Sequence, residues 1–220
     1  MTDQSAPQIS SRKQPKQARS TELVAAILEA AAQVLAQEGA RRFTTARVAE
    51  KAGVSVGSLY QYFPNKAAIL FRLQSDEWRQ TSAQCDAILG DTTSPPLDRL
   101  RTLVHRFVRS EVEEAALRVA LNDAAPLYRD APEAREIDAE GDRIAARFMR
   151  EVLPDAPDAT RQLAGDLVLT TMTAVAKEFS ETPRADAEIG AYADAMSDML
   201  CAYLNGLKHG ADPVESASGE

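Results

Sequence analysis

Apolar residues recur at intervals of three and four along most of the chain, which is the period of an amphipathic helix. Leu23, Ile27, Ala31 and Val34 predict a first long helix from about Thr21 to Glu38. No stretch of useful length alternates between apolar and polar residues as a half-buried strand would, and no repeat with a fixed period is present. The pattern predicts an all-α fold.

Two short helices are predicted directly after the first one. Thr44 can cap a helix that ends at Gly53, and Ser55 can cap a second helix that ends before Pro64. Proline has no backbone N–H to donate, so the chain breaks there, and Asn65 then caps a longer helix. Two short helices joined by a glycine turn and preceded by a long helix predict a helix-turn-helix within a three-helix head.

The rest of the chain predicts a larger helical body. A loop is expected at 90–96, and helices are expected at about 97–120, 132–152, 158–180 and 184–207, separated by proline-bearing breaks. Residues 1–19 are predicted to be a flexible basic arm and residues 209–220 a disordered tail.

The second short helix is too short to be stable alone, so its stability must come from packing against the head. Leu59 and Phe63 have the spacing to face the core, while the tyrosine hydroxyls face outward. A second helix of this kind enters the major groove of DNA. The residues left for outward contact are Ser55, Val56, Gly57, Ser58 and Gln61, with Tyr60 and Tyr62 as phosphate or base contacts. Packing alone is the alternative role for both tyrosines.

Charge is distributed unevenly along the chain. Net charge is -8, yet residues up to Lys66 carry nine basic against five acidic residues, and the remainder carries 16 against 28. This asymmetry indicates a small polyanion-binding head on an acidic body, because attraction to phosphates is local. Chance patchiness is the alternative.

Composition argues against several other classes of protein. Cys85 and Cys201 lack metal-ligand and redox spacing and are predicted to be reduced packing residues in a cytoplasmic protein. The first 20 residues lack the apolar core of a signal peptide, and no apolar run of membrane-spanning length is expected. His105 and His209 are the only histidines, so we predict no metal, no cofactor and no enzymatic activity.

The run from Phe43 to Lys66, FTTARVAEKAGVSVGSLYQYFPNK, with Leu70 beyond it, strongly resembles the DNA-binding head of the TetR family of transcriptional regulators. The resemblance is specific over about residues 17–75 and consistent in helix count afterwards. It implies a homodimeric repressor that binds a palindromic operator and is released by a small-molecule inducer. Residues 20–66 would be the DNA-binding domain, and residues 67–208 the ligand-binding and dimerisation domain.

The resemblance also implies roles for individual residues of the head. Thr45, Tyr60, Tyr62 and Lys66 would contact phosphate, and Val56, Gly57 and Ser58 would face base edges. Ala46 stands where some members have a basic side chain that reads bases. Arg47, the arm or DNA shape would therefore contribute more to recognition.

Apolar stripes on the last two helices suit a helix-to-helix interface, although packing within one subunit is the alternative. The resemblance favours a four-helix dimer interface. Its candidate residues are Leu163, Leu167, Met172, Val175, Phe179, Ile189, Tyr192, Met196, Leu200, Tyr203 and Leu207. Candidates for an inducer pocket are Trp78, His105, Phe107, Tyr128, Phe148, Met149 and Thr171, each of which could instead be ordinary packing.

Two other classes of protein compete with the regulator. An enzyme is disfavoured because the chain has no Glu-x-x-His pair, nucleophile elbow or glycine-rich phosphate loop. A helical protein-interaction module without DNA binding fits the stripes and the acidic body, but it would not need a basic head.

Overall fold

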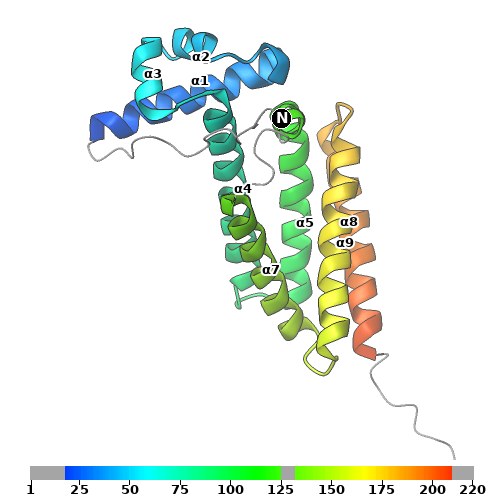
Figure 1. Ribbon diagram of the computed structural model, residues 1–220. Helices are drawn as coiled ribbons and strands as arrows, with labels where there is room; N and C mark the ends of the chain where they lie inside the picture. The colour runs from blue at the N-terminus through cyan, green and yellow to red at the C-terminus, as the bar shows by residue number, and fades with distance from the viewer. Residues whose placement is uncertain (1–17, 125–131, 210–220) are drawn as a thin grey trace, which may run out of the picture. The chain divides into compact units, whose positions relative to one another are not determined.

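The computed structural model describes residues 18–124 and 132–209 (Figure 1). Within these ranges the chain forms helices and no strands, so the predicted all-α class is confirmed. The helices are α1 (Ala18–Arg42), α2 (Thr45–Lys51), α3 (Val56–Tyr62), α4 (Lys66–Gly90), α5 (Pro96–Glu113), α6 (Ala115–Ala124), α7 (Pro132–Val152), α8 (Asp158–Ser180) and α9 (Asp186–His209). The predicted arm and tail lie outside the described residues, apart from the first residues of α1 and the last of α9.

Three side-chain caps start the helices around the helix-turn-helix. The Thr44 hydroxyl accepts a hydrogen bond from the Arg47 N–H at 3.3 Å, and the Ser55 hydroxyl accepts one from the Ser58 N–H at 3.0 Å. The Asn65 Oδ1 accepts one from the Ala68 N–H at 2.9 Å. Each bond satisfies a donor that the first helical turn leaves free, and all three predicted caps are confirmed.

Two glycines adopt the left-handed backbone conformation that other residues rarely adopt. Gly39, at φ 73°, interrupts α1 near its end, and Gly53, at φ 67°, makes the turn between α2 and α3. Gly53 lies where the sequence predicts the first short helix to end, and Gly39 directly follows the predicted end of the first long helix at Glu38. A Cβ at Gly53 would meet nothing within 4 Å, so the backbone conformation and not crowding requires glycine there.

The chain divides into two compact units, and the first contains more than the head. It comprises residues up to Thr81 together with 116–138. Its core buries Phe43, Leu59 and Phe63 from the head, and α6 adds Leu121 to the same cluster. The predicted boundary after residue 66 separates a DNA-binding role from a ligand-binding role. The first compact unit does not end there, because it also includes the first part of α4 and helix α6.

The second unit contains residues 82–115 and 139–220. Helix α5 packs against α8 and α9, which run beside it (Figure 1). Leu100, Val104 and Phe148 lie in its core, and the rings of Phe179 and Tyr192 stack with centroids 3.9 Å apart.

Both cysteines, Cys85 and Cys201, are free thiols. Burial raises the pKa of each thiol, as suits packing residues.

The predicted single helix at 97–120 is wrong, because α5 and α6 are separate helices. Glu114 has φ -106° and ψ 10°, and the chain turns there without a proline or glycine. Glu111 is buried on α5 in the second unit, whereas Leu121 on α6 is buried in the core of the first. The two segments fill different cores, and this tertiary requirement overrides a continuous helical sequence pattern.

Residues 20–42 of α1 are long and apolar enough to cross a membrane by length and average hydropathy, which differs from our expectation. Ile27, Ala31 and Leu35 on this helix are nevertheless fully buried in the core of the first unit. The apolar face of α1 is therefore accounted for by packing against α2, α3 and α4 residues, as in the core helix of a globular protein.

A nearly buried ion pair fastens α6 to α4 within the first unit. Arg118 Nη1 lies 2.8 Å from Glu77 Oε1, and the two side chains are 16% and 11% exposed. Gln74 and Thr81 also donate hydrogen bonds to the Glu77 carboxylate, at 3.1 and 3.3 Å. The carboxylate is therefore well satisfied in spite of its burial.

Replacing Gly53 with alanine is expected to lower the free energy of unfolding by about 1–2 kcal/mol, because alanine at positive φ is strained. The matched control is Gly57→Ala within α3, where a Cβ would meet only the Ser55 Oγ at 3.7 Å. That change should raise stability by about 0.5–1 kcal/mol. Urea unfolding of both variants measures the difference, and equal effects would contradict the role assigned to the Gly53 backbone.

Replacing Arg118 with leucine should lower the free energy of unfolding by about 2–4 kcal/mol, because it leaves the Glu77 carboxylate buried without its cation. The control is Arg79→Leu, which removes an exposed arginine that pairs with Asp76 at 3.4 Å. Thermal unfolding followed by circular dichroism should show a change of no more than about 0.5 kcal/mol for the control. Comparable losses of unfolding free energy in both variants would show that the buried pair of Arg118 and Glu77 stabilises the protein no more than an exposed pair.

Candidate nucleic-acid interface and effector cavity

Helix α3 buries one side in the head and exposes the other. Leu59 is fully buried, and Phe63 follows it into the same core after the helix ends. Val56, Gly57 and Tyr60 are exposed, and Ser58 is half-buried. Apart from Tyr62, the predicted outward residues of the second short helix are therefore accessible, Ser58 only in part.

A hydrogen bond between α2 and α3 fixes part of this face. The Tyr60 hydroxyl lies 3.0 Å from the Thr45 Oγ1, and either group can donate. Tyr60 is 40% exposed, and Thr45 is the first residue of α2. The bond holds two hydroxyls next to each other at the surface, where each retains capacity for a further acceptor or donor.

Tyr62 differs from Tyr60 in its surroundings. Tyr62 is only 7% exposed, and it belongs to the core cluster that contains Leu59 and Phe63. Of the two tyrosines, Tyr62 therefore fits the alternative role of packing in the core, and Tyr60 fits the role of contacting DNA.

Lys66 is exposed at the first residue of α4. Helix α4 has 25 residues, so the partial positive charge at its N-terminus adds to that of the lysine. The helix dipole and the exposed ammonium group together favour a phosphate at this position.

Arg47 makes its contacts on another side of α2. Its guanidinium forms an ion pair with Glu38 of α1 and donates to the Arg42 carbonyl at 3.4 Å. Two residues correspond to about 200° around a helix, so Arg47 and Thr45 point to nearly opposite sides of α2. Arg47 is therefore placed to link α1 and α2, and the structure does not bring it together with Tyr60.

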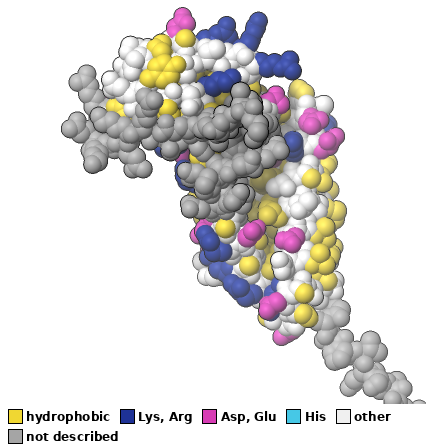
Figure 2. Space-filling model, in the orientation of Figure 1, with side chains coloured by type: hydrophobic (Ala, Val, Ile, Leu, Met, Phe, Trp, Pro, Cys, Tyr) yellow, Lys and Arg dark blue, Asp and Glu magenta, His cyan; other side chains and the backbone are white. Residues whose placement is uncertain are grey.

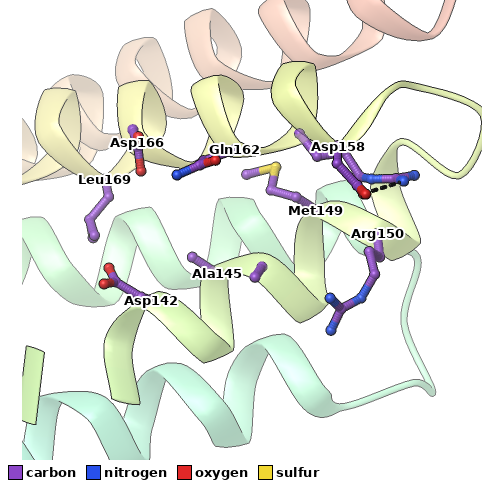
Figure 3. Close-up of a pocket in the computed structure, with 11 residues that line it drawn as sticks. Asp142, Ala145, Met149, Arg150, Asp158, Gln162, Asp166 and Leu169 are labelled. Atoms are coloured by element: carbon purple, nitrogen blue, oxygen red, sulfur yellow. Dashed lines mark hydrogen bonds and ion pairs between the residues drawn. The ribbon is translucent and has the colours of Figure 1, made fainter. Parts of the chain in front are cut away.

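The body contains a cavity of about 290 Å³ between α7 and α8. Ala145 and Met149 lie along its middle, and Asp142, Asp166 and Leu169 lie together at one end (Figure 3). Gly165 also lines the cavity. A Cβ at Gly165 would make an ordinary van der Waals contact with the Met149 Cγ at 3.5 Å, so the glycine leaves a little extra space beside Met149. The other end is formed by Arg150, Asp158 and Arg161.

Of the predicted pocket residues that the structure describes, only Met149 lines this cavity. Phe107 and Phe148 are buried in the core of the second unit, and Thr171 is half-buried on α8. His105 faces the surface, where its Nε2 lies 3.0 Å from Asp194 Oδ1. Trp78 packs against the core of the first unit, and Tyr128 lies outside the described residues.

The predicted dimer stripe divides into buried and exposed members. Met172, Phe179, Ile189, Met196 and Leu200 are buried in the core of their own subunit and are not available to a second copy. Val175, Tyr192, Tyr203 and Leu207 are half-buried against that core. Leu163 and Leu167 are exposed on α8, and Met199 is exposed on α9. Figure 2 shows hydrophobic side chains along the outer edge of these helices.

Sequence reasoning selected aromatic and long apolar residues and therefore missed most of the cavity. Its lining includes small residues and aspartates, which also occur on ordinary solvated helix faces. The available signal was Gly165, a glycine in the interior of an apolar helix, which often marks a close helix approach.

Both parts of the chain match known regulators. Residues 27–73 match the family described as "Bacterial regulatory proteins, tetR family", and residues 95–207 match "Tetracyclin repressor-like, C-terminal domain". The HTH-type transcriptional repressor KstR of Rhodococcus jostii (strain RHA1) is 28% identical over 152 residues, which are 67% of this chain and 70% of that protein. KstR of Mycolicibacterium smegmatis is 31% identical over 60% of this chain and 63% of its own length.

Solved structures agree with the fold. The fatty acid degradation regulator FadR from Bacillus halodurans has a TM-score of 0.64 at 17% identity, covering 85% of this chain and 96% of that one. At this identity the likeness concerns the fold alone. The match at 95–207 spans more than half of the chain and adjoins a matched DNA-binding head, so the chain belongs to the TetR family of transcriptional regulators.

Proposed function

We propose that this protein is a transcriptional repressor that binds a palindromic operator as a homodimer and leaves it when a small molecule binds the body. The observation that carries the proposal is the exposed face of α3, fixed to α2 by the hydrogen bond between Tyr60 and Thr45. The relatives named above are repressors, which supports this direction of regulation.

The proposed contacts with DNA separate into positioning and reading. Lys66 and the N-terminus of α4 would hold one phosphate, and the paired hydroxyls of Thr45 and Tyr60 would hold another. Val56 and Gly57 are exposed at the start of α3, where a small surface permits close approach to base edges. Ser55 and Ser58 share a hydrogen bond of 2.8 Å and keep lone pairs for the bases.

The proposed dimer uses the exposed parts of α8 and α9. Leu163, Leu167 and Ala174 follow one another at helical spacing on α8, and Ala195, Met199 and Ala202 do so on α9. Small residues on α9 would let a second pair of helices approach closely. Two heads in one dimer can bind two half-sites, which raises affinity for a palindrome well above that of one head.

Ligand release requires that the ligand prefer one arrangement of the heads over another. Helix α4 is suited to this coupling, because its residues up to Thr81 belong to the first unit and those from Ser82 to the second. The proposal also places the protein in the cytoplasm, where the DNA is, and assigns it no catalytic activity. Among described residues, no group of three metal-ligating side chains is present.

Replacing Lys66 with alanine should weaken DNA binding about tenfold and reduce the slope of log affinity against log salt by about 1, because one phosphate contact is lost. Fluorescence anisotropy would use the DNA upstream of the protein's own coding sequence and then a selected pool of random sequences. The control is Lys177→Ala, an exposed lysine on α8.

Tyr60→Phe should weaken the same binding by about fivefold, because the hydroxyl bonded to Thr45 is removed while the ring remains. Failure of the folded dimer to select any sequence from the pool would refute the repressor and favour the protein-interaction module. Equal losses for Lys66→Ala and Lys177→Ala would refute the assigned phosphate site.

Replacing Leu167 with glutamate should convert the dimer to a monomer at micromolar concentration, because it places two carboxylates in an apolar interface. The matched control is Leu169→Glu, since Leu167 and Leu169 are 46% and 38% exposed and lie on different sides of α8. Sedimentation velocity separates the two outcomes. A dimer that survives Leu167→Glu, or dissociates equally with Leu169→Glu, would contradict the proposed face.

A further inference from the structure

We propose that the cavity between α7 and α8 binds an elongated organic cation, with its ammonium group beside Asp142 and Asp166 and its apolar body along Met149 and Gly165. The cavity is a place where an effector of this class would bind, so its regulatory meaning rests on the function proposed above. Binding itself does not depend on that function.

The shape of the cavity favours a narrow, chain-like ligand. Its volume of about 290 Å³ lies at the lower end of the range for small-molecule sites. The side chains along its middle are small or flexible, and the buried Met149 can adjust to a ligand. Asp142 and Met149 are seven residues apart, so this part of the cavity extends about 10 Å along α7.

Charge at one end favours a cation. Asp142 and Asp166 come from different helices, and both point into the space between them, beside Leu169 (Figure 3). Among the side chains that the structure describes, neither carboxylate has an ion-pair partner. An ammonium group between them would be attracted by two charges while its alkyl part contacts Leu169.

The arginines at the other end do not cancel this preference. Arg161 donates to the carbonyls of Leu153 and Pro154, at 3.0 and 2.9 Å, and to the Asp158 carboxylate at 2.8 Å. The hydrogen bond from Arg161 lowers the pKa of the Asp158 carboxyl, so this carboxylate stays ionised beside the guanidinium of Arg161. Arg150 extends away from α8 (Figure 3).

The cavity is separate from the proposed dimer face. Leu169 lies two residues beyond Leu167, which corresponds to about 200° around α8. A second copy seated on Leu163 and Leu167 would therefore leave the side of α8 that faces α7 accessible.

The test is isothermal titration of the full-length protein without DNA, below the micelle concentration of each probe. The probes are nonyltrimethylammonium, nonanoate and nonan-1-ol. We expect one site per chain for the ammonium probe, at least tenfold tighter than for the other two. Asp142→Asn combined with Asp166→Asn should weaken ammonium binding at least fivefold, and added salt should weaken it further.

The matched control combines Asp155→Asn with Glu178→Gln, which removes the same charge from exposed positions that do not line the cavity. It should bind the ammonium probe as the parent protein does. A cavity-filling variant, Ala145→Leu, should weaken all chain-like probes. Equal binding of the three probes, or equal losses in the cavity and control variants, would overturn the proposal.

A separate arm tests the regulatory meaning. The ammonium probe is added to the complex of the protein with its selected DNA, and release is followed by anisotropy. Release that is lost with Asp142→Asn and Asp166→Asn would support an effector site. Binding in the titration without any change in the DNA complex would overturn the effector assignment and leave the DNA-binding function standing.

Discussion

The surface proposed to meet DNA depends on the burial of Leu59 and Phe63. Helix α3 has seven residues, and a helix of that length does not persist in water. Its exposed face has a defined geometry only because its other face is held in a core to which α1, α2, α4 and α6 also contribute. The Ser55 cap and the left-handed Gly53 turn then determine where the helix begins. DNA recognition by this proposed surface would therefore depend on the whole first unit.

The inclusion of α6 in that unit connects two parts of the sequence that a linear domain boundary would separate. Arg118 on α6 and Glu77 on α4 are joined by a largely buried ion pair, and Leu121 shares a core with Phe43. Removing either charge is costly, so α6 and the first part of α4 are expected to respond together to any force on one of them. A mutation in α6 would thus alter the proposed DNA-binding surface without contacting DNA.

The head was predictable from sequence because its signals are local. Thr44, Ser55 and Asn65 cap helices through bonds to residues three positions away, and Gly53 adopts a conformation that few other residues tolerate. The body was less predictable because its features arise from distant partners. No proline or glycine near Glu114 predicts the break between α5 and α6. The helical period predicts that Met196 is on an apolar face, but it does not show whether that face packs within its own subunit or against a second copy. The direction of Arg47 likewise depends on Glu38 across a helix boundary.

Helix α8 presents Leu167 and Leu169 to different surroundings although they are two residues apart. If the first contacts a second copy and the second lines the cavity, partner choice and ligand choice are encoded on separate sides of one helix. Descendants of a duplicated gene would then diverge in the small molecule they sense while still pairing with each other. A mixed dimer of such descendants would integrate two chemical signals at a single operator.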